Sequence, residues 1–418
     1  MIKNKDFNIL LVGRLIANFG DSLYSIATML LVYSMTGSAL YTGLALFITS
    51  SAAIIQVLFS PLLDQINLKR YLIGSQFIQA ILLILIPLLN HLELLKVSYI
   101  FIIMFVISLI NQIIYPAQVS ILPKLLNEEE LVKANSLFTA AYQGSDALFN
   151  AIAGLLITIF GIFTMYYINS ATFLINTIVF ILLSSLISKL NQNIKTSSKS
   201  NRFKLVNHFK QLKNGLSLWK EETLFPLLVG VIFINFASTG IFANLPVFAI
   251  NEIHYSFLLS TMGVGVLIGA IIAGKKKSQS VLLGHFYIIG IMSIGILWFA
   301  MTFISGNSQI NIITSLILFF IGWLIVGVLN VFSQTIVQLI VAPEKVGVAM
   351  GSMIGISTTL APLGALTGGI IGNYFGVKIA MATFSMLFVL VAMYWIFNTS
   401  IRKLESITNM IQKRSEVL

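Results

Sequence analysis

The fold is decided by the stretch from Lys189 to Glu222, which reads KLNQNIKTSSKSNRFKLVNHFKQLKNGLSLWKEE. It is the longest part of the chain that is too polar to lie within a membrane, and it carries eight Lys and Arg residues against two Glu. Almost unbroken apolar sequence flanks it on both sides. A membrane-spanning helix needs about 20 apolar residues, and each flank divides into six segments of that length. We therefore expect two six-helix halves joined by a cytoplasmic loop.

The composition excludes most other classes of protein. Of the 418 residues, 57% are hydrophobic and only 9% are charged, whereas soluble domains carry roughly 25% charged residues. A chain with this small number of charges cannot cover a water-facing surface. We therefore expect most of its surface to face lipid. The first apolar segment is too long for a cleaved signal peptide. The absence of Cys excludes disulfides and thiol sites, and the four scattered His residues form no metal-binding pattern, so we expect no cofactor.

The distribution of positive charge orients the predicted helices. We place them at residues 8–35, 40–63, 71–90, 97–122, 135–160, 164–188, 224–250, 256–274, 281–304, 310–341, 346–372 and 377–398. With these spans, 22 of the 25 Lys and Arg residues fall on the two tails and the even-numbered connections. Positive residues collect on the cytoplasmic side. Both termini are therefore expected on the cytoplasmic side of a bacterial cell membrane. The membrane topology accounts for the net charge of +11, so no nucleic-acid partner is expected.

Four regions follow from this organisation. They are an N-terminal six-helix bundle (1–188), a cytoplasmic linker (189–223), a C-terminal six-helix bundle (224–400) and a cytoplasmic tail (401–418). In the linker, apolar residues recur at three- or four-residue steps among lysines, at Phe203, Val206, Phe209, Leu212, Leu216 and Trp219. This pattern predicts an amphipathic helix on the inner membrane surface. The second half also repeats the first weakly, at an offset of 217 residues from Val12 to Val229.

Three ionisable residues lie deep in the predicted spans: Arg14, Asp21 and Asp146. A charge at such depth costs at least about 2.5 kcal/mol on insertion scales, so each is a candidate for function. Arg14 and Asp21 are seven residues apart and share one helix face. One hypothesis is that Asp21 takes up and releases a proton under the influence of Arg14, while Asp146 is a second proton site or contacts a cationic substrate. The alternative is a structural ion pair between Arg14 and either acid, or an Arg14 side chain that extends to the lipid headgroups.

A charged connection follows the second span and reads SPLLDQINLKR from Ser60 to Arg70. Its charges, Asp64, Lys69 and Arg70, form a predicted clasp at the cytoplasmic surface. The stretch resembles the signature Gly-x-x-x-Asp-Arg-x-Gly-Arg-Arg of the major facilitator superfamily, with Asp64 at the Asp and Lys69 at the last base. Ser60 replaces the first glycine of that signature.

The resemblance extends along essentially the whole chain. Residues 12–23, 123–136 and 168–175 are similar to macrolide-efflux-like and siderophore-exporter-like members of this superfamily. The resemblance implies an all-α membrane protein of twelve transmembrane helices in two pseudo-symmetric halves, acting as a monomeric drug:proton antiporter by alternating access. Of the antiporter signature Gly-Pro-x-x-Gly-Gly, only the last glycine is present, at Gly154. Span 346–372 carries glycines at four-residue steps, which we expect to contact the opposite half.

A substrate cavity in this fold is expected to be lined by the first, fourth, seventh and tenth spans. The polar and aromatic candidates there are Asn18, Tyr24, Asn111, Gln112, Tyr115, Asn235, Asn244, Asn330, Gln334 and Gln338. The alternative for each amide is a hydrogen bond to a neighbouring helix.

Three functions remain open at this point. The first is proton-coupled export of a hydrophobic or amphipathic drug-like molecule, the second is dedicated export of a metal-chelating or similar metabolite, and the third is a lipid flippase. An apolar, aromatic cavity favours the first and a polar, charged cavity favours the second. The partners are then the small molecule, protons and membrane lipids. No phosphate-binding Gly-x-x-x-x-Gly-Lys-Ser/Thr loop is present, so neither an enzyme nor ATP-driven transport is expected.

Overall fold

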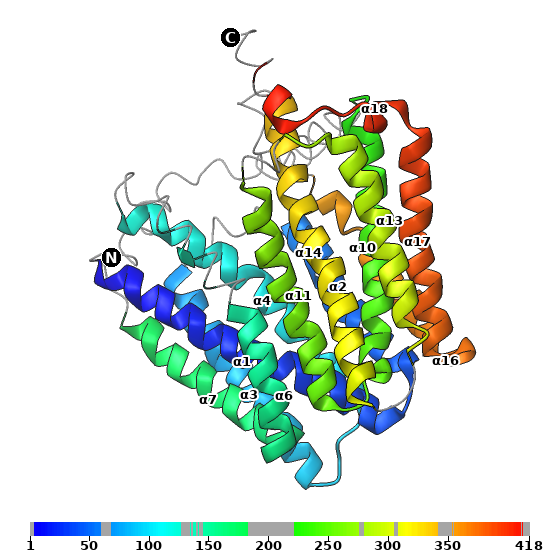
Figure 1. Cartoon of the computed structure of the whole chain (residues 1–418). Helices are drawn as coiled ribbons and strands as arrows, with labels where there is room; N and C mark the ends of the chain where they lie inside the picture. The colour runs from blue at the N-terminus through cyan, green and yellow to red at the C-terminus, as the bar shows by residue number, and fades with distance from the viewer. Residues whose placement is uncertain are drawn as a thin grey trace. The chain divides into compact units, whose positions relative to one another are not determined.

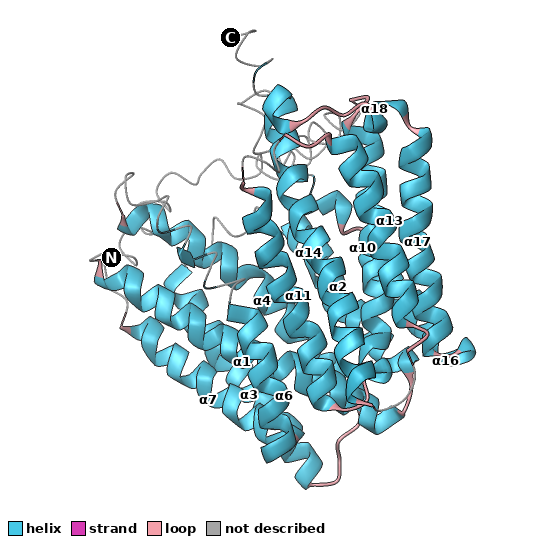
Figure 2. Cartoon of the chain, viewed as in Figure 1, coloured by secondary structure: helices cyan, strands magenta, loops and turns pink. Residues whose placement is uncertain are grey.

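The computed structural model describes residues 4–59, 68–126, 134, 137–138, 141, 145–182, 221–275, 280–304, 308–341, 353, 355–410 and 412. Within these residues every regular element is helical (Figure 2). Ten of the described helices are long and apolar enough to cross a membrane, and two shorter apolar helices, Ala39–Ala53 and Ser145–Phe160, lie where two further spans are predicted. The all-α, multi-span fold predicted from the sequence is thereby confirmed.

The chain divides into two compact units, whose helices are labelled in Figure 1. Unit 1 comprises Met1–Gly37, Ile48–Val206 and Asn251–Ser260, and unit 2 comprises Ser38–Phe47, Asn207–Ile250 and Thr261–Leu418. Unit 1 contains α1 (Lys5–Thr36), α3 (Leu68–His91), α4 (Val97–Leu125), α6 (Ser145–Phe160), α7 (Ile162–Ile181) and the larger part of α2 (Ala39–Phe59). Unit 2 contains α10 (Leu224–Phe248), most of α11 (Glu252–Ala273), α13 (Leu283–Met301), α14 (Gln309–Ile340), α16 (Ala361–Phe375), α17 (Val377–Phe397) and α18 (Thr399–Arg402).

Two helices contribute to both units. The first residues of α2 belong with unit 2 because Gly43 lies against α16, where an added Cβ would be 2.7 Å from the Cα of Gly369. The first residues of α11 belong with unit 1 because Ser256 fills the space beside Gly154 of α6. Small residues let helices approach closely in lipid, where there is no hydrophobic driving force to bring them together. The predicted sequential bundles remain a prediction, and the amphipathic linker helix falls outside the described residues.

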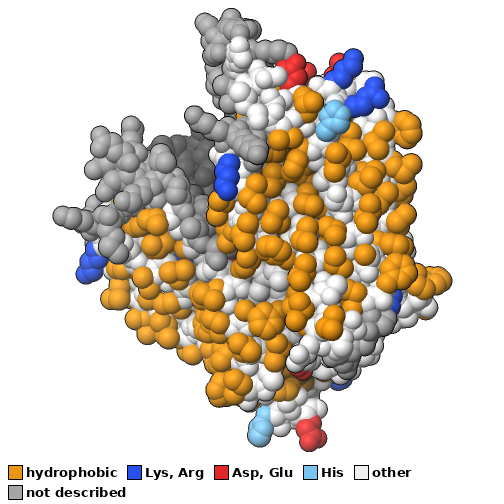
Figure 3. All heavy atoms as spheres, in the orientation of Figure 1, with side chains coloured by type: hydrophobic (Ala, Val, Ile, Leu, Met, Phe, Trp, Pro, Cys, Tyr) orange, Lys and Arg blue, Asp and Glu red, His pale blue; other side chains and the backbone are white. Residues whose placement is uncertain are grey.

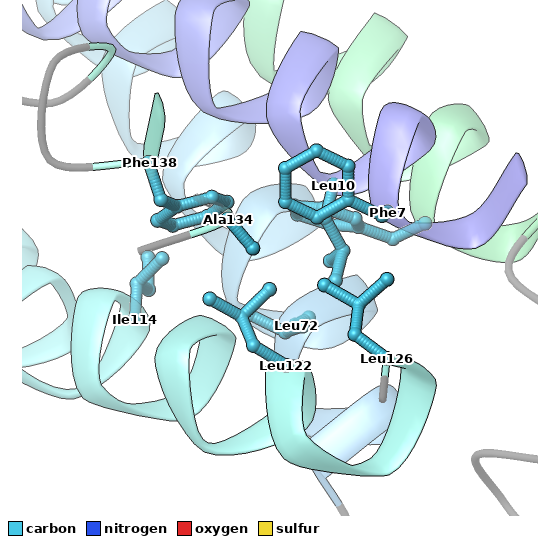
Figure 4. Close-up of a cluster of buried hydrophobic side chains, with 9 residues drawn as sticks. Phe7, Leu10, Leu72, Ile114, Leu122, Leu126, Ala134 and Phe138 are labelled. Carbon is cyan, nitrogen blue, oxygen red and sulfur yellow. The ribbon is translucent and has the colours of Figure 1, made fainter. Parts of the chain in front are cut away.

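A buried hydrophobic cluster holds α1, α3, α4 and α7 of unit 1 together (Figure 4). Its members are Phe7, Leu10, Leu72, Ile114, Leu122, Leu126, Ala134, Phe138 and Phe180, none of which is more than 8% exposed. Side chains from α1 and α4 point toward one another across this cluster. Its packing fixes the spacing of the same helices that carry the polar residues described below.

The glycines of α16 lie against α10 and against the start of α2. An added Cβ at Gly364 would overlap the carbonyl oxygen of Phe236, and one at Gly368 would overlap that of Gly240. Gly372 lies equally close to the Asn244 side chain. All three glycines lie against α10 of the same unit, and Gly372 also lies against α2, where its added Cβ would be 3.0 Å from the Cβ of Ala39. Gly369, one residue off the stripe, contacts the start of α2 as well. Because α2 belongs to the predicted N-terminal bundle, these contacts do not contradict the expectation that the span meets the opposite half.

Large apolar side chains cover the outside of the described helices. On the face shown in Figure 3 they are interrupted by few charges, and exposed examples include Phe397 at 81%, Ile310 at 75% and Phe303 at 70%. In water such a surface would cause association. Lipid acyl chains are the solvent that matches it.

Candidate functional site

A polar cavity of about 260 Å³ lies within unit 1. It is lined by residues of five helices, namely Arg14, Ala17, Asn18, Asp21, Tyr24 and Ser25 of α1, Gln76 of α3, Asn111 and Ile114 of α4, Asp146 of α6 and Phe173 of α7. Ile114 also belongs to the hydrophobic cluster, so the cluster adjoins the cavity. All three ionisable residues predicted from the sequence therefore meet at one place.

Arg14 and Asp21 form an ion pair inside this cavity. Arg14 Nη2 donates to Asp21 Oδ2 at 3.3 Å, and the two side chains are 5% and 29% exposed. The second carboxylate oxygen of Asp21 accepts from Asn111 Nδ2 at 3.4 Å. Arg14 is thus buried toward the acid, and the alternative in which it extends to the headgroups is wrong. Asp21 keeps a partly open surface on the cavity side.

Asn18 holds Arg14 from the other side. Its Oδ1 accepts from Arg14 Nε at 2.7 Å and also contacts Arg14 Nη2. Its Nδ2 donates to the carbonyl oxygen of Ala141 at 2.7 Å and to Ser145 Oγ at 2.9 Å. Asn18 is therefore a bridge between the guanidinium and the segment that leads into α6. Arg14 consequently has an anchor that does not depend on Asp21.

Asp146 lines the same cavity from the first turn of α6. Among the described residues its carboxylate makes no hydrogen bond and no ion pair, unlike that of Asp21. When both acids are ionised, these three side chains together carry one more negative charge than positive charge. The described residues contain no group of three His, Cys, Asp or Glu side chains arranged to hold a metal ion.

The other predicted cavity residues are dispersed. Asn235 Nδ2 donates to the carbonyl oxygens of Val231 and Ser357, and Asn244 Nδ2 donates to those of Gly240 and Gly368. Their amides therefore tie α10 to the chain leading into α16 and to α16 itself. Five candidates remain. Asn330 and Gln334 are exposed on α14 and Gln112 is half-buried on α4, and none of these three lines the unit 1 cavity. The side chains of Tyr115 and Gln338 lie outside the described residues.

Only part of the predicted clasp can be located. Asp64 lies outside the described residues, and Arg70 is exposed at the start of α3. Lys69 Nζ donates to the carbonyl oxygen of Ile181, the last residue of α7, at 3.1 Å. A cation at this position interacts favourably with the carboxyl end of a helix. The proposed role of these charges in conformational change stays a prediction.

Two polar residues of the lining, Gln76 and Ser25, are absent from the residues predicted from the sequence. The prediction drew only on spans one, four, seven and ten, whereas Gln76 lies on the third span. The available signal was an amide in an otherwise apolar helix, where a polar side chain must find a partner. Ser25, Ala17, Ile114 and Phe173 complete the lining and carried no comparable signal.

Comparison with known families decides what kind of protein carries this cavity. Residues 10–357 match the family model described as Major Facilitator Superfamily. The chain belongs to the major facilitator superfamily. It is therefore a multi-pass membrane transporter for small molecules and not an enzyme. The macrolide-efflux or siderophore-exporter branch stays a prediction.

Relatives and solved structures of this superfamily resemble the chain over nearly its full length. Two Bacillus subtilis (strain 168) proteins, described as the uncharacterized MFS-type transporters YvqJ and YfmI, are 25% and 26% identical to it. The alignments cover 90% and 94% of this chain, and 88% and 96% of the relatives. The crystal structure of the nucleoside transporter NupG superposes with a TM-score of 0.70 at 12% identity, covering 94% of this chain and 98% of NupG. At that identity the likeness concerns the fold alone.

Proposed function

We propose that this transporter couples the export of a small molecule to proton movement, and that Asp21 is the group that gains and loses the proton. The observation that carries the proposal is the position of the Asp21 carboxylate. It is paired with Arg14 at 3.3 Å and still 29% exposed where it lines the cavity. Ionisable residues within membrane helices are rare and mark substrate and ion pathways, proton relays and ligand counter-ions.

The surroundings of Asp21 allow its charge to change without collapse of the site. When Asp21 is ionised, Arg14 and Asn111 both donate to it. When Asp21 is protonated, Arg14 loses its counter-ion but keeps its bonds to Asn18. Because Asn18 is itself tied to Ala141, this anchor belongs to the framework and does not titrate. Protonation therefore changes the charge of the cavity by one unit while the guanidinium stays in place.

The lining of the cavity supports a polar metabolite as the exported compound. The lining has three ionisable side chains and five side chains with an amide or hydroxyl group, one of which is Tyr24. Its apolar members are Ala17, Ile114 and Phe173. Pockets for apolar drugs are lined mainly by hydrophobic and aromatic side chains. Export of a drug-like amphipathic molecule rests on the family resemblance. The orientation with both termini in the cytoplasm rests on the distribution of Lys and Arg.

The test begins with the substrate. A strain lacking the transporter is compared with its parent for compounds retained inside the cell. A retained compound is then offered to inside-out membrane vesicles, with and without an imposed proton gradient. Wild-type protein is expected to accumulate the compound only when the gradient is present. Asp21→Asn is expected to lose gradient-driven accumulation but to keep exchange of labelled for unlabelled compound.

The matched control is Asp6→Asn, which removes an acid from the same helix outside the cavity. It is expected to leave gradient-driven accumulation unchanged. If Asp21→Asn accumulates the compound as well as wild-type protein does, Asp21 is not the coupling site. If wild-type accumulation ignores the proton gradient, proton coupling itself is wrong.

A further inference from the structure

The inward face of α3 carries two amides in a row of apolar side chains. Leu72, Gln76, Gln79 and Leu83 follow at steps of four, three and four residues, and all are fully buried. A buried amide is costly unless its donor and acceptor are both satisfied. A leucine or methionine would fill either position without that cost. The amides therefore need an explanation other than packing.

Gln76 has one satisfied atom and one unsatisfied atom. Its Oε1 accepts from Asn176 Nδ2 of α7 at 2.7 Å. Its Nε2 has no hydrogen-bond partner in the described part of the chain, and Gln76 lines the polar cavity. The bond from Asn176 uses the acceptor of this amide, so Nε2 is the donor of a cavity-lining side chain that still lacks a partner. Gln79 is equally buried and also unpartnered, but it does not line the cavity.

The charges of the cavity indicate which kind of group a second part of the ligand would carry. Arg14 pairs with Asp21, whereas Asp146 forms no salt bridge with a described residue and is attracted to Arg14 only at longer range. A cation in the cavity would offset this excess negative charge in surroundings of low dielectric constant. The volume of about 260 Å³ lies just below the roughly 300–1,000 Å³ typical of pockets for drug-sized ligands. A small molecule, or one end of a larger one, fits this space.

We propose that Gln76 contacts the substrate, and that the cavity takes a small organic cation bearing a hydrogen-bond-acceptor oxygen. The cationic group lies toward Asp146, and the oxygen accepts from Gln76 Nε2. This inference rests on the proposed transport function and adds the chemical class of the compound. It assigns to the third span a role in specificity beyond holding the bundle together.

Three small probes separate the two halves of this recognition. Choline carries a permanent positive charge and a hydroxyl oxygen, ethyltrimethylammonium keeps the charge without the oxygen, and 3,3-dimethyl-1-butanol keeps the oxygen without the charge. Binding is measured on the purified full-length protein in detergent, from the rise in unfolding temperature with probe concentration. Wild-type protein is expected to bind choline most tightly, roughly five- to tenfold better than ethyltrimethylammonium, because one hydrogen bond is lost.

Paired variants then locate the effect. Gln76→Met keeps the side-chain volume and removes the donor, so choline and ethyltrimethylammonium are expected to bind it equally. Gln79→Met makes the same change on the same helix at equal burial outside the cavity, and it is expected to keep the wild-type preference. Asp146→Asn is expected to weaken both cations and leave the neutral alcohol unchanged.

The proposal is overturned if wild-type protein does not distinguish the three probes, or if Gln76→Met keeps the preference for choline. It is also overturned if Gln79→Met abolishes that preference as fully as Gln76→Met does, since the effect would then come from the fold. A negative result in the binding experiment would not contradict the proposal of proton coupling. The vesicle experiment on Asp21 uses a compound that is identified without reference to Gln76. Conversely, loss of proton coupling would leave the binding preferences measurable.

Discussion

The opening helices of the two units, α1 and α10, make the same framework contact and differ in what they add to it. Asn18 of α1 and Asn235 of α10 are 217 residues apart, which is the offset of the internal repeat. Asn18 donates to the carbonyl oxygen of Ala141, and Asn235 donates to that of Ser357, close to the same offset. In unit 1 the other side of this amide carries Arg14. In unit 2 the corresponding position is Val231, so no charge is held there.

A second pair of positions shows the same difference. Gly13 of α1 lies against α7, where an added Cβ would be 2.6 Å from Asn176 Oδ1. Gly230 of α10, again 217 residues on, lies against the ring of Trp395 in α17. One glycine therefore receives an amide and the other receives a buried indole. Both halves of the repeat therefore have a glycine at this position, where a neighbouring helix packs closely. In unit 1 the glycine contacts a polar side chain, and in unit 2 it contacts an aromatic ring.

The largest expected effect tests the apolar side of this comparison. Trp395 is fully buried, and its Nε1 donates to the carbonyl oxygen of Pro226 at 3.0 Å. Trp395→Ala should therefore destabilise the protein by about 3–5 kcal/mol. Asn176→Ala, at the matching contact in unit 1, should cost only about 1–2 kcal/mol because it loses one hydrogen bond and a smaller volume. Thermal unfolding in detergent measures both, and equal losses would contradict the contrast.

A smaller effect is expected where a glycine of α1 meets α7. A Cβ added at Gly20 would overlap Asn169 Oδ1 and Thr172 Oγ1. Gly20→Ala should cost about 1–3 kcal/mol in unfolding free energy, since the neighbouring helix must shift. Gly74 of α3 has no atom within 4 Å of such a Cβ. Gly74→Ala should instead be neutral or stabilise by about 0.5–1 kcal/mol, and a loss at Gly74 equal to that at Gly20 would disprove the packing argument.

The two asparagines provide the sharpest functional comparison. Asn18→Ala and Asn235→Ala each remove an amide that joins two helices, and each should cost about 0.5–1.5 kcal/mol of stability. Only Asn18→Ala also removes the second anchor of Arg14. Gradient-driven transport in vesicles should therefore fall for Asn18→Ala and remain near wild type for Asn235→Ala. Equal transport by the two variants would show that the anchor of Arg14 has no part in coupling.

The smallest effect lies at the helix ends. Lys69 at the start of α3 donates to the carbonyl oxygen of Ile181 in α7, and Lys378 at the start of α17 donates to that of Ile304, just after α13. Each lysine thus ties together two helices of its own unit. In unit 1 these are α3 and α7, and in unit 2 they are α17 and the end of α13. Lys69→Met and Lys378→Met should each cost about 0.3–1 kcal/mol, with the loss shrinking at high salt. A larger or salt-independent loss in unfolding temperature would argue for a further role.

What could be predicted from the sequence depended on local periodicity. The spans 97–122 and 377–398 differ from α4 and α17 by at most three residues at either end, because a membrane helix is defined by its own run of apolar residues. Arg14 and Asp21 could be placed on one face for the same reason, since residues seven apart share a face of any α-helix. Even the third ionisable residue, Asp146, was found by its cost in lipid.

The tertiary structure decided which side chains meet. The bond from Asn18 to Ala141 spans 123 residues, and that from Asn176 to Gln76 spans 100. Such contacts depend on how each helix is rotated about its axis and on which glycines admit a neighbour, neither of which appears in the apolar pattern of a single span. That is why Gln76 was missed while Asn244, predicted for a cavity, instead binds the carbonyl oxygen of Gly368. The sequence alone determined where the helices lie along the chain and which charges enter the membrane, and only packing between helices determined which of those polar groups share a cavity.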